Sequence, residues 1–264
     1  MEIVQFDING KFAHFRKYYA NNTALTYSLP PRTTVMGMLA AISGMPRDGY
    51  YEELASDKIR IGIAVKALIK KSFHRLNFLS IKSLGDFKKS FDSDFRGMAG
   101  NPIQTPFEVV TGYDISEDHV SYRIFLGSTD AGKSTFQLLK KRLLARDSVF
   151  TLTLGPANFH ASFANVVSYE KDQIMEKQAS AEYISFDSAV NSQDVTDLVF
   201  EKEEAAFVEE ELLPADFIAN HNRELSKMNR VLFTTGGVVL KLKLTGNYYI
   251  IQDQTNSQTI QFLE

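Results

Sequence analysis

The sequence of 264 residues predicts an α+β protein, and three observations lead to this prediction. Several short stretches alternate between apolar and polar residues as strands do, two longer stretches are typical of helices, and the order along the chain is β-α-β twice. This order predicts a ferredoxin-like split βαβ domain over residues 1–165, the scaffold also used by RNA-recognition domains. A basic insertion of about residues 70–107 divides it, and a smaller β-rich module follows over residues 166–264.

The first β-α-β unit is predicted from residues 1–65. Residues 1–9 alternate like a strand, and residues 59–65 do the same with a high content of β-branched side chains. Between them a Pro-Pro pair ends any extended segment. Thr33 or Thr34 can then cap a helix that runs to about Ser43, where a glycine and a proline end it.

The second unit follows the insertion. We expect a strand over residues 120–126, a helix over 134–145, a strand over 149–154 and a turn at 155–158. Residues 71–107 lack sustained periodicity and contain several glycines and prolines. Such a long irregular segment inside a compact fold is typical of a functional or partly disordered loop.

The C-terminal module is predicted from four short apolar stretches. Its strands are expected at residues 162–169, 231–233, 238–244 and 248–252. The acidic segment from residue 201 to residue 211 is expected to link its parts.

The charge of the chain is unevenly distributed. The formal net charge of −3 combines +6 over residues 1–160 with −9 over residues 161–264. Residues 58–96 alone carry 10 Lys and Arg against 3 acids. A polyanion partner on that segment is one interpretation, because phosphate neutralisation with counterion release drives nucleic-acid binding. A solvated surface loop is the alternative that charge alone leaves equally open.

Several chemistries are excluded or not supported. The chain has no cysteine, which removes disulfides, thiol nucleophiles, zinc–thiolate sites and iron–sulfur clusters. Its five histidines show no metal-ligand spacing, and no trio of Lys, His and Tyr is singled out as the acid and base of a metal-free ribonuclease. The longest apolar stretch is about half of a membrane span. We therefore expect a soluble cytoplasmic protein without a metal, a cofactor or a membrane contact.

One motif would indicate nucleotide binding. Residues 127–134, Gly-Ser-Thr-Asp-Ala-Gly-Lys-Ser, match the phosphate-loop pattern G-x-x-x-x-G-K-[ST] and lie between a predicted strand and a predicted helix. Two features oppose this interpretation. No convincing second strand ends in an Asp for magnesium, and no run of α/β units follows to complete a parallel sheet. The alternative is a polar turn in which Ser128 or Asp130 caps the helix.

The loop from Gly10 to Tyr19 mixes bases with aromatic residues. Bases can contact phosphates, and aromatic rings can stack on unpaired nucleotides. In the alternative interpretation Phe12 and Phe15 fill the core while Arg16 is solvated.

Four segments together resemble a known family. Residues 10–16 (Gly-Lys-Phe-Ala-His-Phe-Arg) and 27–44 (from Tyr-Ser-Leu-Pro-Pro-Arg-Thr-Thr to Ser-Gly) are similar to the N-terminal signature of the fifth CRISPR-associated (Cas) family, of the repeat-associated mysterious protein (RAMP) superfamily, in its type I-B-like branch. Residues 153–161 resemble the later glycine-containing turn of that family. Residues 102–108, followed by 122–125, resemble its return into the fold.

The resemblance implies a ferredoxin-like domain with an inserted thumb, here about residues 70–107. It implies a non-catalytic subunit of the Cascade surveillance complex that holds the 5′ handle of CRISPR RNA at one end of the assembly. Its partners would be CRISPR RNA, the Cascade backbone and large subunits and, through the complex, target DNA. The phosphate-loop match would then be a coincidence. The alternatives are a phosphate-loop nucleotide hydrolase and a metal-free endoribonuclease that processes CRISPR RNA.

One contact is expected from geometry without the resemblance. A capped helix start with free amides and an adjacent Arg32 forms a phosphate site, although a plain capped helix with a solvated Arg32 is the alternative. The residues expected to contact RNA are Arg16, Lys17, Tyr27, Arg32, Thr33, Arg75, Asn77, Lys82, Lys88, Lys89, Gly155 and Asn158.

Overall fold

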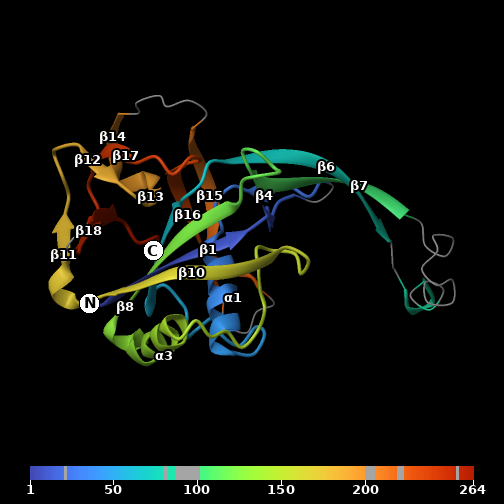
Figure 1. Cartoon of the computed structure of the whole chain (residues 1–264), viewed down its shortest axis with the longest axis horizontal. Coiled ribbons are helices and arrows are strands. Elements are labelled where there is room, and N and C mark those ends of the chain that lie inside the picture. The colour runs from blue at the N-terminus through green and yellow to red at the C-terminus, as the bar shows by residue number, and fades with distance from the viewer. Residues whose placement is uncertain are drawn as a thin grey trace.

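The computed structural model describes residues 1–20, 23–79, 83–86, 88, 102–199, 206–218, 223–253 and 256–264. It is a mixed α/β structure rich in strands, with few helices (Figure 1). Within the described residues, no helix is long and apolar enough to cross a membrane.

The centre of the protein is a five-stranded antiparallel sheet with the order β5-β8-β1-β10-β9. Its strands are β1 (Ile3–Gly10), β5 (Ile59–Val65), β8 (Val120–Ser128), β9 (Leu152–Thr153) and β10 (His160–Tyr169). The strand β1 lies between β8 and β10 and is buried over almost its whole length, which indicates that both faces of the sheet are covered. The predicted strand over 149–154 is wrong in length, because only Leu152–Thr153 pairs with β10.

Helices α1 and α3 pack together on one face of this sheet (Figure 1). Helix α1 (Arg32–Ser43) connects β1 to β5, and α3 (Lys133–Leu144) follows β8. As predicted, α1 ends at Gly44, which adopts the left-handed conformation with φ of 80°. The predicted threonine cap is wrong, because the helix begins directly after Pro31 and has no side-chain cap. A proline needs no hydrogen-bond partner for its nitrogen and favours a helix start.

The C-terminal strands cover the opposite face. Ile3 and Phe125 of the sheet pack against Tyr249, Ile260 and Phe262. These strands form three small sheets: β11 (Ile174–Gln178), β12 (Ile184–Phe186), β13 (Val190–Asn191), β14 (Val195–Val199), β15 (Val208–Phe217), β16 (Leu225–Thr234), β17 (Leu240–Leu244), β18 (Asn247–Gln252) and β19 (Ser257–Ile260).

Two predictions about the C-terminal part need correction. The acidic segment does not only link elements, since Glu209, Glu210 and Glu211 lie on β15. The predicted boundary at residue 165 falls inside β10, which continues in the central sheet to Tyr169. The main core also includes side chains from both sides of that boundary.

A long two-stranded ribbon extends away from the sheet (Figure 1). It consists of β6 (Ile69–Leu79) and β7 (Pro102–Gly112), which pair antiparallel from Ile69↔Gly112 to Leu79↔Pro102. The ribbon lies where the basic insertion is predicted, but residues 71–79 and 102–107 are regular strands. The sequence lacks apolar alternation there because residues 73–77 are exposed on both faces, so no buried face imposes a pattern.

Candidate nucleic-acid interface

Three parts of the chain meet at the base of the ribbon: residues 12–27, strand β7 of the ribbon itself, and the turn after β9. The short strand β2 (Phe12–Ala13) pairs with β7, and β3 (Phe15–Arg16) pairs with β4 (Thr26–Tyr27). A bridge between Ala24 and Phe107 joins the second pair to the ribbon. The aromatic and basic loop predicted from Gly10 to Tyr19 therefore lies against the ribbon.

The turn after β9 is the third segment. The His14 amide donates to the Leu154 carbonyl at 2.9 Å, and the Phe12 and Phe159 ring centroids lie 5.8 Å apart. Gly155 has φ of 105°, and a Cβ at this position would lie 1.9 Å from the His14 carbonyl oxygen. Glycine is therefore required for the loop and the turn to approach each other. Asn158 is exposed on the same turn.

His14 is buried in this junction. Its ring stacks on Phe107 with centroids 4.1 Å apart, and its Nδ1 lies 2.7 Å from the Glu108 carbonyl oxygen. Burial lowers the pKa of His14, which favours the neutral ring at neutral pH. This geometry is that of a packing residue and does not present a general acid or base to solvent.

The loop presents one cation and two aromatic rings to solvent. Arg16 is exposed and donates only to the Ala20 carbonyl oxygen, at 3.2 Å, among the described residues. Tyr18 and Tyr19 are each more than half exposed and contact each other edge to face. Exposed rings beside an unpaired guanidinium can stack on bases and hold a phosphate.

One face of strand β6 repeats this chemistry. Phe73, Arg75 and Asn77 occupy alternate positions and therefore share a face, and all three are exposed. Phe73 is 62% exposed, so its ring is free to meet a base. Arg75 and Asn77 are among the residues predicted from the sequence, whereas Phe73 is not. The spacing of two residues from Arg75 is the signal that could have identified it.

Three further predicted cations, Lys82, Lys88 and Lys89, belong to the sequence between β6 and β7. Lys88 is exposed, whereas Lys82 and Lys89 fall outside the described residues.

Two other basic residues are neutralised within the protein. Lys17 forms an ion pair with Glu211 at 3.2 Å, and Lys71 lies 3.4 Å from both Glu209 and Glu211. Burial opposes the charge of Lys17, but the attraction of Glu211 outweighs it and raises the pKa of the ammonium group. Strand β15 of the C-terminal part thus supplies the carboxylate. The ammonium group of Lys17, which is predicted to contact RNA, is already paired with Glu211.

Tyr27 is a core residue at this position. Its side chain is 1% exposed, and burial raises the pKa of its hydroxyl well above the ordinary value. Lys17 lies 5.3 Å from the centre of the ring. The predicted RNA contact of Tyr27 is therefore wrong for its ring, which supports the loop from within.

Arg32 requires the clearest correction. Its side chain is 2% exposed and forms an ion pair with Asp216 of β15. It also donates to the carbonyl oxygens of Leu54 at 2.8 Å and Ile59 at 2.6 Å. The guanidinium therefore points into the core rather than toward a phosphate. Arg32 links α1 to β5 and to the C-terminal module.

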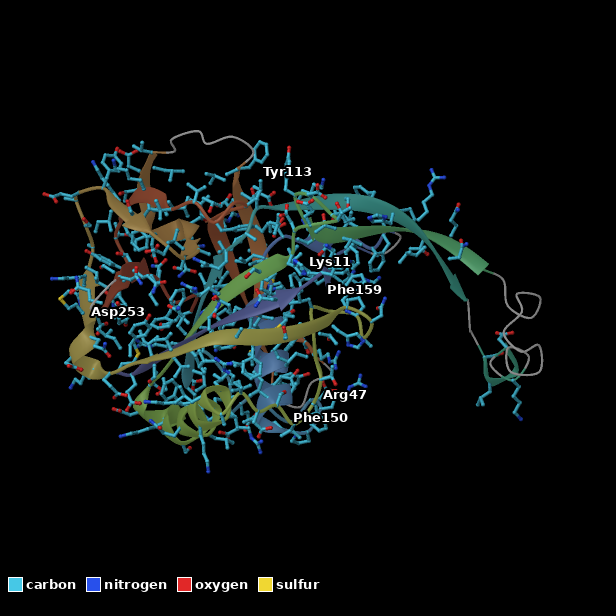
Figure 2. All side chains as sticks on the ribbon, in the orientation of Figure 1. Lys11, Arg47, Tyr113, Phe150, Phe159 and Asp253 are labelled. Atoms are coloured by element: carbon cyan, nitrogen blue, oxygen red, sulfur yellow. The ribbon has the colours of Figure 1, made fainter. Side chains whose placement is uncertain are left out.

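The start of α1 nevertheless lines a cavity of about 360 Å³. Thr33 and Gly155, both predicted site residues, lie on its wall together with Thr34 and Thr153. The cation of this cavity is Arg223, which forms an ion pair with Asp48 at 2.9 Å. The start of α1 thus lines a cavity rich in hydroxyl groups, but Arg32 is not among the residues of its wall. Figure 2 labels Lys11 and Phe159 near the base of the ribbon, and Arg47 and Phe150 near the helices.

Residues 127–134, which match the phosphate-loop pattern, do not follow a strand of a parallel sheet. Strand β8 is antiparallel to both of its neighbours, and the match continues through a 3-10 turn (Asp130–Gly132) into α3. The Thr129 amide donates to the Lys58 carbonyl oxygen at 2.9 Å, and a Cβ on Gly132 would lie 2.2 Å from that same oxygen. The loop is closed against the protein at these positions. We also find no cluster of metal-ligating side chains in the part of the chain that the structure describes.

Lys133 is exposed, and we expect that it does not bind a nucleotide phosphate, so that Lys133→Ala behaves like the parent in ATP titrations. The parent protein should show no saturable ATP binding at millimolar concentration, because the Thr129 and Gly132 amides of the loop already donate within the protein. Isothermal titration calorimetry of the parent and of Lys133→Ala with ATP measures this. Saturable binding that disappears in the variant would support the nucleotide-hydrolase interpretation instead.

The fold and the surface together define a class: a strand-rich mixed α/β protein with a central antiparallel sheet, a projecting basic ribbon and exposed aromatic residues at its base. The family model described as "CRISPR-associated protein (Cas_Cas5)" matches residues 3–230. The chain belongs to this Cas5 family.

Three solved structures are similar to this chain, and the first of them supports the fold. A crystal structure of a CRISPR protein from Archaeoglobus fulgidus is similar over 100% of both chains, with a TM-score of 0.55 and 11% sequence identity. A chain of a CRISPR RNA-guided surveillance complex covers 90% of each chain with a TM-score of 0.45 and 14% identity. A structure titled as a Cas protein covers 92% of this chain and 95% of the other with a TM-score of 0.43 and 14% identity. A search of curated proteins gave no match.

Proposed function

We propose that this chain is a non-catalytic subunit of a type I-B-like Cascade complex that binds the 5′ handle of CRISPR RNA and caps one end of the assembly. Membership of the Cas5 family supports the first part of this proposal. The exposed residues at the base of the ribbon support the second part, because they combine the chemistries that bind single-stranded RNA.

The single observation that carries the proposal is the outward face of β6. Phe73, Arg75 and Asn77 alternate on a strand whose exposed positions have no core to contact. A ring, a guanidinium and an amide in this order can stack on a base, hold a phosphate and contact a base edge. Arg16 with Tyr18 and Tyr19 offers the same groups on the adjacent loop.

The topology is consistent with the domain assignment. The strand order β5-β8-β1-β10, with α1 and α3 on one face, supports a ferredoxin-like split βαβ unit with the ribbon as its inserted thumb. We propose that the ribbon contacts the Cascade backbone subunit, that the large subunit binds nearby, and that target DNA is reached only through the assembled complex in the cytoplasm. The cavity at the start of α1 has the hydroxyl groups and size to receive one nucleotide of the handle.

The proposal includes the absence of catalysis. We expect labelled precursor CRISPR RNA to remain intact after incubation with the protein, because the buried His14 is not presented to solvent as a general acid or base. Specific cleavage next to the handle would instead support the endoribonuclease alternative.

The decisive test replaces Phe73 with serine. If the exposed ring stacks on a base, handle RNA should bind about tenfold more weakly, since one base–aromatic stack is worth about 1–3 kcal/mol. The matched control is Phe207→Ser, because Phe207 is 65% exposed on the C-terminal module. Binding is measured by fluorescence anisotropy with the assembled complex. Equal affinity of both variants and the parent would remove the ribbon face from the RNA site.

A further inference from the structure

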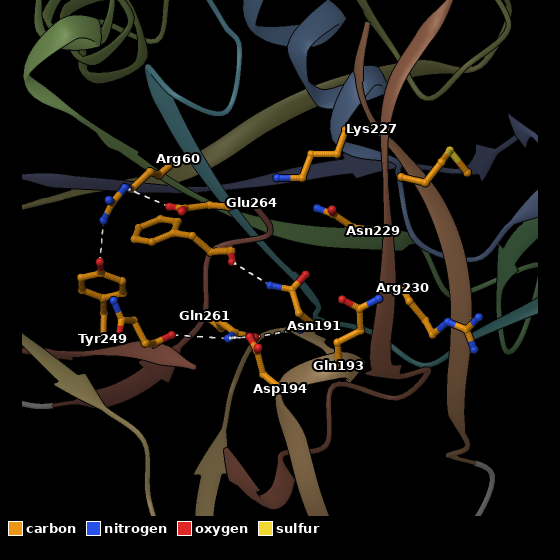
Figure 3. A pocket seen from close by; sticks show the side chains of 13 residues that line it. Arg60, Asn191, Gln193, Asp194, Lys227, Asn229, Arg230, Tyr249, Gln261 and Glu264 are labelled. Carbon is orange, nitrogen blue, oxygen red and sulfur yellow. Dashed lines mark hydrogen bonds and ion pairs between the residues drawn. The ribbon is translucent and has the colours of Figure 1, made fainter. Parts of the chain in front are cut away.

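A second polar cavity lies between β5 of the central sheet and the C-terminal module (Figure 3). Its volume is about 440 Å³, which falls in the range of sites for small ligands. Its walls come from β5, β16 and β18 and from the segments around residues 191–194 and 261–264.

Part of the wall is fixed by internal pairs. Arg60 forms an ion pair with Glu264 at 2.9 Å and donates to the Tyr249 hydroxyl at 2.5 Å. The Gln261 side-chain nitrogen donates to Asp194 at 2.7 Å, while its side-chain oxygen accepts from the main-chain N–H of Asn191 at 2.7 Å. These bonds hold two carboxylates and an amide in set positions before any ligand arrives, which lowers the cost of binding.

Two groups on β16 are not paired in this way. Asn229 is 7% exposed, and its side-chain nitrogen is buried without a hydrogen-bond partner among the described residues. Lys227 is exposed on the same face of the strand, and no carboxylate of a described residue lies within 4.0 Å of its ammonium. Figure 3 shows both side chains directed into the space between β16 and Glu264. A buried amide without a partner costs free energy that a ligand oxygen would recover.

We propose that this cavity binds one ribonucleotide unit. The Lys227 ammonium supplies a cation for its phosphate, and Asn229, with Asn191 opposite, supplies amide groups for the donor and acceptor edge of a base. The carboxylates of Asp194 and Glu264 accept hydrogen bonds from hydroxyl groups, as a ribose requires. The site is separate from the RNA surface of the ribbon.

The test is calorimetric titration of the full chain with AMP, GMP, CMP and UMP. At least one should bind saturably, and Lys227→Gln should weaken that binding about tenfold, as loss of a charge-assisted contact does. Asn229→Leu, which keeps the side-chain size, should weaken it comparably. Lys241→Gln is the control, because Lys241 is exposed on the same module but does not line the cavity.

Further arms identify what is recognised and its source. The 2′-deoxy form and the unphosphorylated nucleoside of the preferred base should each bind more weakly than the ribonucleotide. A short oligoribonucleotide of that base that binds more tightly, with the same sensitivity to Lys227→Gln, assigns the site to an RNA strand; exclusion of the oligonucleotide assigns it to a free nucleotide.

Two results would overturn the proposal: no saturable binding of any of the four nucleotides, or binding that both substitutions on β16 leave unchanged. If Asn229→Leu lowers the melting temperature, its binding result is set aside. The nucleotide affinity of Lys227→Gln then tests the proposal alone, because Lys227 is exposed. Handle binding through Phe73 is a separate measurement, so either proposal can fail without the other.

Discussion

Replacing Arg32 with methionine should lower the free energy of unfolding by about 3–5 kcal/mol, the usual cost of removing one partner of a buried ion pair. Asp216, 8% exposed, would remain buried without its counter-ion. The carbonyl oxygens of Leu54 and Ile59 would lose a donor as well. Urea denaturation followed by circular dichroism measures the loss.

Two variants make this result specific. Arg223→Met removes a matched ion pair whose partners are both about half exposed, so it should cost less than about 1 kcal/mol. The double variant Arg32→Met with Asp216→Leu should recover much of the stability, because no charge is left buried without a partner. If Arg32→Met were as stable as Arg223→Met, the guanidinium would not hold α1 to β15 as the structure indicates.

The second large effect concerns RNA. Changing Arg16, Arg75 and Lys88 together to alanine should weaken handle binding at least about tenfold and reduce the slope of log affinity against log salt by about 2, since each lost phosphate contact on single-stranded RNA removes about 0.7. All three side chains are exposed, and no ion pair of theirs is found among the described residues. Titrations of the assembled complex at several salt concentrations measure both quantities.

The control removes the same charge elsewhere. Lys133, Lys141 and Lys177 are exposed on α3 and β11, away from the ribbon. Their replacement by alanine should leave the salt slope almost unchanged. Equal slopes for the two triple variants would mean that general charge, rather than the ribbon and loop, attracts the RNA.

Much of the central sheet can be predicted from the sequence. The strands at 59–65 and 120–126 and the helix that ends at Ser43 are confirmed within one or two residues, because each has a buried face that imposes a pattern and α1 has a glycine at its end. The ribbon escapes prediction because exposed strands carry no such pattern. For the same reason Phe73 was missed although Arg75 and Asn77 were identified.

The roles of individual cations depend on partners far away in the sequence. Arg32 and Lys17 follow helix and loop signals that are typical of exposed residues. Their counter-ions, Asp216 and Glu211, lie almost 200 residues later, on β15. No local pattern indicates that this strand returns to the N-terminal elements. Arg16 has no such counter-ion among the described residues, and its RNA contact stays a prediction.

The ribbon also determines the reach of this protein. Eleven paired positions at about 3.3 Å each make a ribbon of roughly 35 Å, whose inner end, with Ile69 and Val110, belongs to the core. Its outer part pairs only with itself, so a molecule that binds there touches none of the core that determines stability. Sequence changes near the tip can therefore alter the choice of neighbour at little cost to folding, whereas changes at the base affect both.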